Sequence, residues 1–341
     1  MQNFFDFQPR RVSIFDYIDE DDPVFTYTED FDATTSGSSK MTVTLPAPPC
    51  SVYAPTDGAI EMLQQMTGVD QLKDHARRLL NMHAYNQKIM ALGKKPHSMN
   101  LHSIYSGGVG TGKTTAAVLT ASILKEAGVL SRGHLVSVDR TTFSGKNYGV
   151  AEQNLRIVVA AAQGGVLFFD EAYLLQGVSR DDCMRNILPM LLEILADESR
   201  RDFCVVLAGY PREMENLLSE NKGLSSRFVN RFTFPSFTKE QLLEITRHRL
   251  EAFDYEMTPE AWTKYGALVE RTMAECDRSF GNGRWVANTL EDVYLQHALR
   301  CVDDVECKDP LALGSSESIL NLITAADIPE YRPSRKRKLG Y

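Results

Sequence analysis

Eight residues around position 110, Gly107–Thr114, have the types and the spacing of a phosphate-binding loop. They read Gly-Gly-Val-Gly-Thr-Gly-Lys-Thr and match the pattern G-x-x-x-x-G-K-S/T. Glycines allow the partly left-handed backbone that turns N–H groups toward phosphate oxygens, and the lysine adds positive charge beside the β- and γ-phosphates. The Thr114 hydroxyl is a predicted ligand of Mg²⁺. We therefore expect a nucleoside triphosphate to be bound here, by Gly108, Val109, Gly110, Thr111, Gly112, Lys113, Thr114 and Thr115.

Two carboxylates follow the apolar run Val166–Phe169, and their position suits hydrolysis of that triphosphate. In enzymes with such a loop, an acidic residue at the end of a neighbouring strand holds Mg²⁺, which is the role we predict for Asp170. The adjacent carboxylate is then well placed to polarise the attacking water, so we predict that Glu171 is the general base.

These residues need a scaffold that brings the ends of strands together, and the chain predicts one. A strand over 101–106 precedes the loop and a helix over 113–126 follows it. Further strands are expected over 134–138, 166–169, 203–208 and 232–234, with helices over 71–92, 149–163 and 182–197. Alternation of this kind predicts an α/β fold with a parallel sheet.

After Pro235 the pattern becomes helical only. The residues Thr238–Gln241 form a capping box that opens a helix ending near Ala252, and Pro259 is the expected first residue of another. A third helix is expected over 284–301. The predicted domains are therefore an α/β nucleotide-binding domain over 59–235, a small all-helical domain over 236–303, and a tail over 304–341 whose end, Ser334–Lys338, is basic.

The first 58 residues form a zone of different composition. They hold ten acidic and three basic side chains, whereas the rest of the chain holds 35 and 34. High charge without helical periodicity predicts disorder, while the phenylalanines and tyrosines of this zone leave open a docking segment for a partner. The near-neutral remainder disfavours nucleic acid as a partner.

The composition also indicates the cellular compartment of the protein. The six cysteines form no C-x-x-C pair and no cluster with histidine, which favours a reducing compartment and disfavours a zinc site. The start of the chain lacks the basic and apolar features of a signal peptide, and no run approaches 18 apolar residues. We therefore expect a cytoplasmic protein without membrane partners.

Taken together, these motifs resemble the AAA+ ATPases, and within them the CbxX/CfqX group of red-type Rubisco activases and SpoVK-like proteins. The likeness runs from about Met66 to Cys301. It is carried by the phosphate loop, the Asp-Glu pair and the segments 133–138, 164–173, 205–210, 226–228, 232–235 and 283–284.

The resemblance implies a homo-oligomeric ring, usually a hexamer, with ATP at each boundary between subunits and a helical lid after the α/β domain. Arg227 lies where the family places the arginine that reaches the neighbour's γ-phosphate, and Arg231 is a second candidate. Arg284 matches the lid arginine that contacts phosphate within its own subunit. Gly68 and Val69 match the segment that lines the adenine pocket.

Two positions depart from the family pattern. Tyr210 stands at the end of the fourth strand, where many relatives have a polar residue such as asparagine; it either orients water or packs. In the segment of the pore loop, the aromatic Tyr148 comes one residue late, with Asn147 in the usual slot.

The function expected from the sequence is an ATPase that remodels a protein client, whose identity stays unknown. The alternative is an ATP-dependent scaffold or regulatory switch with little threading activity, which the shifted pore aromatic favours. A nucleic-acid motor is disfavoured by the charge.

Overall fold

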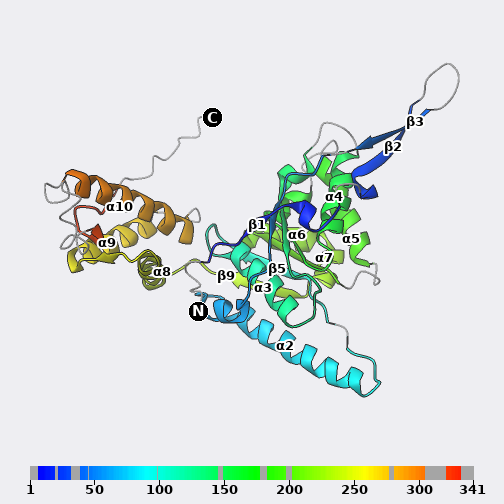
Figure 1. Cartoon of the computed structure of the whole chain (residues 1–341), viewed down its shortest axis with the longest axis horizontal. Helices are drawn as coiled ribbons and strands as arrows, with labels where there is room; N and C mark the ends of the chain where they lie inside the picture. The colour runs from blue at the N-terminus through cyan, green and yellow to red at the C-terminus, as the bar shows by residue number, and fades with distance from the viewer. Residues whose placement is uncertain are drawn as a thin grey trace. The chain divides into compact units, whose positions relative to one another are not determined.

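The computed structural model describes residues 7–19, 22–31, 39–44, 46–97, 99–144, 149–176, 183–196, 202–275, 280–303 and 320–331. The chain divides into two compact units, seen in Figure 1. The first, the sheet unit, comprises Gln8–Gly107 and Lys113–Phe234. The second, the lid unit, comprises the chain from Pro235 onward together with Phe7 and with Gly108–Gly112 of the expected phosphate loop.

The sheet unit is built on a seven-stranded sheet with the order β1-β4-β6-β7-β8-β5-β9. Every residue of β7 and β8 is buried, as a parallel sheet covered on both faces requires. The predicted α/β fold with a parallel sheet is therefore confirmed. The parallel strands are β6 (Leu135–Val138), β7 (Val166–Phe169), β8 (Cys204–Gly209), β5 (Ser103–Gly107) and β9 (Asn230–Phe234).

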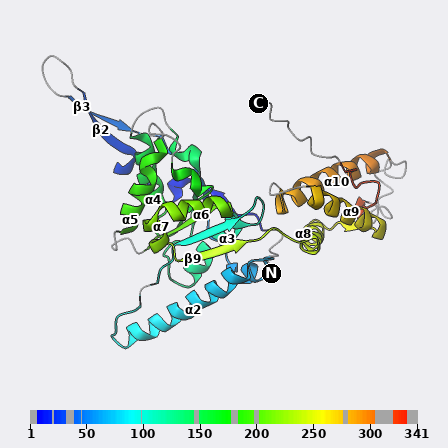
Figure 2. The same ribbon diagram turned by 180° about the vertical axis from the view of Figure 1, so that it is seen from behind.

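Helices cover this sheet (Figures 1 and 2). Leu167 and Phe169 of β7 belong to one hydrophobic cluster with residues of α4, α5, α6 and α7, while α3 packs against β5, β6 and β7. The helices are α1 (Ala59–Gln65), α2 (Asp70–Ala91), α3 (Lys113–Glu126), α4 (Val150–Ala161), α5 (Ile187–Ala196), α6 (Pro211–Glu220) and α7 (Lys222–Arg227). Short 3-10 turns lie at Ile14–Asp16, Pro23–Phe25, Arg140–Phe143, Ala172–Gln176 and Cys183–Asn186.

From Gln8 onward, the described part of the N-terminal zone belongs to the sheet unit, which differs from the disorder expected for residues 1–58. β1 (Arg11–Val12) pairs antiparallel with β4 (Ser51–Tyr53), and β4 pairs antiparallel with β6 at the sheet edge. Ile14, Ile18 and Phe25 are buried in the same cluster as β7.

Ring stacking and hydrogen bonds attach this zone to the sheet unit. The ring of Tyr17 stacks on that of His134 with a centroid separation of 3.6 Å, and Arg132 donates to the Tyr17 carbonyl at 2.7 Å. Two of the acidic residues that suggested disorder accept hydrogen bonds from turn backbone: Asp16 Oδ2 from Ser13 N, and Asp22 Oδ1 from Val24 N. Strands β2 (Thr26–Phe31) and β3 (Ser39–Thr44) form a hairpin that extends from the unit (Figures 1 and 2).

We expect Phe25→Ala to destabilise the protein by about 3–5 kcal/mol, the usual cost of removing a buried phenylalanine. Phe25 is 2% exposed, whereas its ring neighbour Phe15 is 38% exposed. Phe15→Ala is therefore the matched control and should cost about 1 kcal/mol or less. Urea unfolding of both variants checks this, and equal midpoints would mean that the N-terminal zone is not part of the folded core.

In its described residues, the lid unit contains three helices and a short parallel strand pair. α8 (Lys239–Ala252) begins with the predicted capping box, in which Thr238 N donates to Gln241 Oε1 at 2.9 Å and Gln241 N to Thr238 Oγ1 at 3.3 Å. α9 spans Pro259–Glu275, with proline first as predicted, and α10 spans Gly283–Asp303. β10 (Glu256–Met257) pairs with β11 (Leu322–Ile323), which adds strands to a domain expected to be purely helical.

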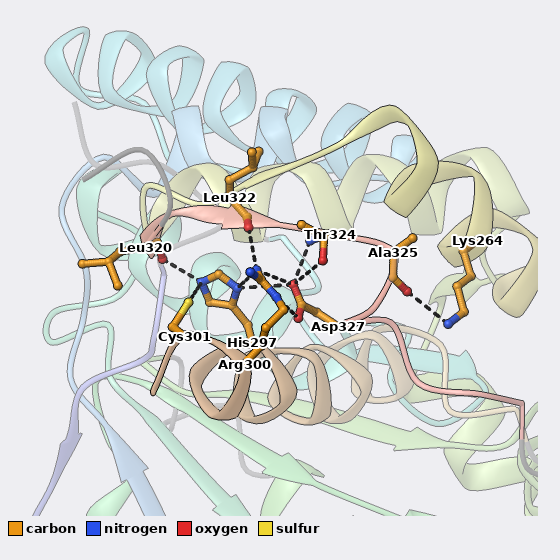
Figure 3. Close-up of polar contacts among 9 residues, drawn as sticks. All are labelled: Lys264, His297, Arg300, Cys301, Leu320, Leu322, Thr324, Ala325 and Asp327. Atoms are coloured by element: carbon orange, nitrogen blue, oxygen red, sulfur yellow. Dashed lines mark hydrogen bonds and ion pairs between the residues drawn. The ribbon is translucent and has the colours of Figure 1, made fainter. Parts of the chain in front are cut away.

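Residues 320–331, expected to lie in the tail, are part of the lid core (Figure 3). Asp327, 1% exposed, accepts hydrogen bonds from Arg300 Nε at 2.8 Å and Nη2 at 2.9 Å, and from Thr324 N at 2.8 Å. His297 lies against the same carboxylate and bonds the Leu320 carbonyl at 2.7 Å. Ile323 and Ile328 are buried among the lid helices. The basic end, Ser334–Lys338, lies outside the described residues.

The Asp327 carboxylate should stabilise the lid in a pH-dependent manner. Burial alone would raise its pKa, but hydrogen bonds from Arg300, Thr324 and His297 outweigh burial and lower the pKa from 3.8 to about 2. A native pKa below the unfolded one gives stability that is full above about pH 4 and is lost as the pH falls toward 2. The difference corresponds to about 2 kcal/mol.

We therefore expect Asp327→Asn to lower the free energy of unfolding at pH 7 by about 2 kcal/mol or more. The gap between variant and wild type should narrow between pH 4 and pH 2, where the native carboxylate takes up its proton. Asp292→Asn, at an exposed position on α10, the helix that carries Arg300, is the control. Thermal unfolding at a series of pH values measures both, and a gap that stays constant to pH 2 would contradict the assigned pKa.

Candidate functional site

The expected phosphate loop joins the end of β5 to the first turn of α3. Gly110 and Gly112 have φ values of +67° and +88°, the left-handed backbone that favours glycine. Thr111 is buried, and its hydroxyl donates to the Gly108 carbonyl at 3.0 Å. Lys113 begins α3, and its Nζ donates to the Gly107 carbonyl at 2.9 Å. Thr114 and Thr115 follow in the same first turn, half-buried.

Asp170 and Glu171 follow β7 directly, at the same sheet edge at which β5 ends, because the two strands run parallel through β8. Asp170 N donates to the Val138 carbonyl at 2.9 Å, which fixes the strand end beside β6. Glu171 is exposed and has φ +52°, a left-handed conformation that is uncommon for a residue with a side chain. Its N–H donates to Asp170 Oδ1 at 3.1 Å.

Tyr173, for which the sequence predicts no role, lies close to the Glu171 carboxylate. Burial raises the pKa of Tyr173 to about 12, helped by the charge of Glu171 and a hydrogen bond to it. The Tyr173 ring packs on Gly209, where an added Cβ would come within 2.9 Å of the ring, and lies 6.1 Å from the ring of Tyr210. Tyr173 is therefore a neutral phenol at pH 7, close to the Glu171 carboxylate. The sequence signal that could have pointed to Tyr173 is its position two residues after Glu171.

Tyr210 follows the last residue of β8 at this edge and is the N-cap of α6, whose first residue is Pro211. It is half-buried and its ring faces that of Tyr173. The structure thus brings the end of β5, Asp170, Glu171 and Tyr210 to one edge of the sheet unit.

Arg227 is the last residue of α7 in the sheet unit and is half-buried. Its guanidinium donates to the Gly223 carbonyl at 3.4 Å, and its own carbonyl accepts a hydrogen bond from Asn100 at 2.8 Å. Burial lowers the pKa of nearby His102 to about 4, and the positive charge of Arg227 adds to this effect. Arg231, the second candidate, is exposed on β9.

The remaining predicted residues lie at helix starts. Gly68 has φ +77° and precedes Val69, a buried residue at the N-terminus of α2. Arg284 is exposed in the first turn of α10 in the lid unit, and its N–H donates to the Gly281 carbonyl at 3.0 Å. Asn147 and Tyr148 of the expected pore loop lie outside the described residues.

Comparisons with known families match both units. The profile described as "ATPase family associated with various cellular activities (AAA)" matches residues 103–236, and that of an AAA lid domain matches residues 238–338. Residues 320–331 thus fall within the lid match. Among solved structures, the AAA domain of FIGL-1 is similar with a TM-score of 0.49 and 15% identity, over 80% of this chain and 87% of that one.

Several known proteins are similar over most of the chain. Stage V sporulation protein K of Bacillus subtilis is 33% identical over 70% of this chain and 74% of its own length. Protein CbbX of Cereibacter sphaeroides is 34% identical over 71% and 79%. A chloroplastic ribulose bisphosphate carboxylase/oxygenase activase of Cyanidioschyzon merolae is 33% identical over 70% and 80%.

Within the described ranges, none of the helices has the length and apolar character needed to cross a membrane.

Proposed function

This chain belongs to the AAA ATPases, in the CbxX/CfqX group, and is an ATP-hydrolysing enzyme; on that premise, we propose that it works as a ring that remodels a protein client. One relative is named as an activase of another enzyme, which supports a protein as the client. The near balance of 35 acidic and 34 basic residues after position 58 supports a client other than nucleic acid. We propose six copies and a cytoplasmic location, as in the sequence analysis.

In our proposal the phosphates of ATP are bound by Gly108, Val109, Gly110, Thr111, Gly112, Lys113, Thr114 and Thr115. The left-handed glycines and the helix that starts at Lys113 support this assignment, because helix N-terminal N–H groups and their dipole attract phosphate oxygens. In this structure the Lys113 ammonium donates to the Gly107 carbonyl. In our proposal, phosphate oxygens of bound ATP take the place of that carbonyl as the acceptor. Gly68 and Val69 line the adenine, and Arg284 contacts phosphate from the lid.

The residues at the sheet edge fit Mg²⁺. A threonine hydroxyl and a carboxylate are the oxygen ligands that Mg²⁺ prefers, and so small a protein donor set suits an ion that keeps waters and substrate phosphates as further ligands. We propose that Thr114 and Asp170 hold it. When bound, the ion neutralises charge on the β- and γ-phosphates.

Glu171 is the proposed general base. The observation that carries the proposal is its left-handed backbone at the end of a fully buried parallel strand, at the edge where the phosphate loop begins. A strained backbone of this kind costs about 1–3 kcal/mol and is commonly retained at functional sites. Tyr173 lies close enough for the charge of Glu171 to raise its pKa, while exposure leaves the Glu171 carboxylate open to water. Glu171 then accepts a proton from the attacking water.

Arg227 is proposed to act on the ATP of the neighbouring copy, where its charge stabilises the developing charge of the γ-phosphate. Support comes from its anchored backbone at the end of α7 and from its guanidinium, whose hydrogen bond to the Gly223 carbonyl is long, at 3.4 Å.

Electron microscopy of the Glu171→Gln protein with ATP and an unfolded polypeptide tests the ring and the client together. We expect closed rings with polypeptide density in the central pore. Rings with an empty pore would favour the scaffold alternative instead. Single copies in the presence of ATP would contradict the proposal.

A further inference from the structure

Asn282 lies in the turn that begins α10 and is buried within the lid unit, with 1% of its surface exposed. Its φ of +48° is left-handed, a conformation that asparagine tolerates better than most residues. Glycines flank it on both sides, at 281 and 283. A buried amide in such a turn must have its polar atoms satisfied, so its partners matter.

The Asn282 amide uses both of its N–H donors and its oxygen. Nδ2 donates to the Val109 carbonyl at 3.0 Å and to the Phe280 carbonyl at 3.1 Å. Oδ1 accepts from Phe237 N at 2.9 Å. One side chain thus connects the phosphate loop, the turn before α10 and the segment that leads into α8.

The backbone next to Asn282 also contacts the loop. Gly283 N donates to the Gly110 carbonyl at 3.0 Å. A Cβ added to Gly110 would lie 2.0 Å from the Gly281 carbonyl oxygen. Glycine is therefore required at position 110 for two reasons, the positive φ and this close backbone contact.

These bonds fix two successive peptide planes of the loop. No cis peptide bond occurs among the described residues, and in a trans peptide the carbonyl and the following N–H point in opposite directions. Holding the Val109 and Gly110 carbonyls toward Asn282 and Gly283 therefore turns the N–H groups of Gly110 and Thr111 to the other side. Those N–H groups belong to the proposed phosphate cradle.

We propose that Asn282 is a positioning residue that orients the phosphate loop for nucleotide binding. The inference rests on the proposed phosphate site and adds a residue that touches neither ATP nor Mg²⁺. Asn282→Gly keeps the left-handed backbone without strain and removes the amide. Asn282→Asp keeps the acceptor for Phe237 N but sets a carboxylate oxygen against the Val109 and Phe280 carbonyls.

Titration of the full-length variants with a fluorescent ATP analogue tests this. We expect both substitutions to weaken binding roughly tenfold or more. Thr246→Val is the control: its buried hydroxyl bonds Leu242 and Tyr265 within the lid, so it should lower the thermal midpoint without changing affinity. An affinity of Asn282→Gly equal to that of the wild type, or an equal loss in Thr246→Val, would overturn the inference.

In the same titration, Lys113→Ala tests the proposed phosphate site separately from the positioning role of Asn282. Loss of binding in Lys113→Ala together with normal binding in Asn282→Gly would reject only the role of Asn282. Normal binding in Lys113→Ala would reject the phosphate site itself, and the inference with it.

Discussion

Replacing Glu171 by glutamine should leave ATP binding intact and reduce hydrolysis by roughly 10²–10⁴-fold, the usual contribution of a general base. The amide keeps the size of the side chain, but it cannot accept a proton from water. A phosphate-release assay measures the rate, and titration with a fluorescent ATP analogue measures the affinity.

Two further variants frame this result. Lys113→Ala should lose nucleotide binding, because the positive charge beside the phosphates is gone. Lys113→Ala is thus expected to fail at binding, whereas Glu171→Gln is expected to bind ATP and fail at hydrolysis. Glu215→Gln, at an exposed position on α6, is the control for loss of a surface carboxylate and should hydrolyse ATP normally. Near-normal turnover in Glu171→Gln would remove Glu171 from the role of base.

Arg227→Ala should cut hydrolysis by roughly 10³-fold or more while leaving nucleotide affinity nearly unchanged. An arginine that reaches the neighbour's γ-phosphate acts mainly on the charge that develops in the transition state, so binding depends on it little. The rate per copy, measured at concentrations that keep the protein assembled, gives the effect.

Arg231→Ala is the matched variant, since this arginine is exposed on β9 only four residues further on. If Arg231→Ala is the inactive protein and Arg227→Ala the active one, the two assignments exchange. If neither loses activity, no arginine from this part of the chain serves the neighbouring site.

The fold was predictable where apolar runs and local signals are strong. Strand β7 and helix α3 have the predicted bounds, Val166–Phe169 and Lys113–Glu126. Such elements are specified locally: a fully apolar run reads as a buried parallel strand, and Thr238 with Gln241 is a sequence-level start signal for a helix.

The N-terminal zone was not predictable, because its contacts are long-range and its strands are short. β1 has two residues and β4 has three, too few to show a period of two. The order of this zone depends on burying a few apolar side chains and on stacking Tyr17 on His134, more than a hundred positions away. High charge dominated the composition and concealed those anchors.

The finer parts of the site escaped prediction for the same reason. The residue types at the loop and after β7 point to their chemistry, but the left-handed backbone of Glu171 and the buried amide of Asn282 appear only in the fold. The ion pair between Arg300 and Asp327 likewise joins residues that lie 27 positions apart in the sequence. Polar contacts between distant elements leave no pattern in the sequence.

A mixture of two inactive proteins tests the central claim, that each ATP site is completed by Arg227 of the next copy. Lys113→Ala copies have the arginine but no working phosphate loop, and Arg227→Ala copies have the loop but no arginine. In mixed rings, some boundaries join an intact loop to an intact arginine, so we expect phosphate release to reappear on mixing. A mixture of Lys113→Ala with Glu171→Gln should stay inactive. If the first mixture is also inactive while mixed rings form, or if single wild-type copies hydrolyse ATP at the full rate, the claim is wrong.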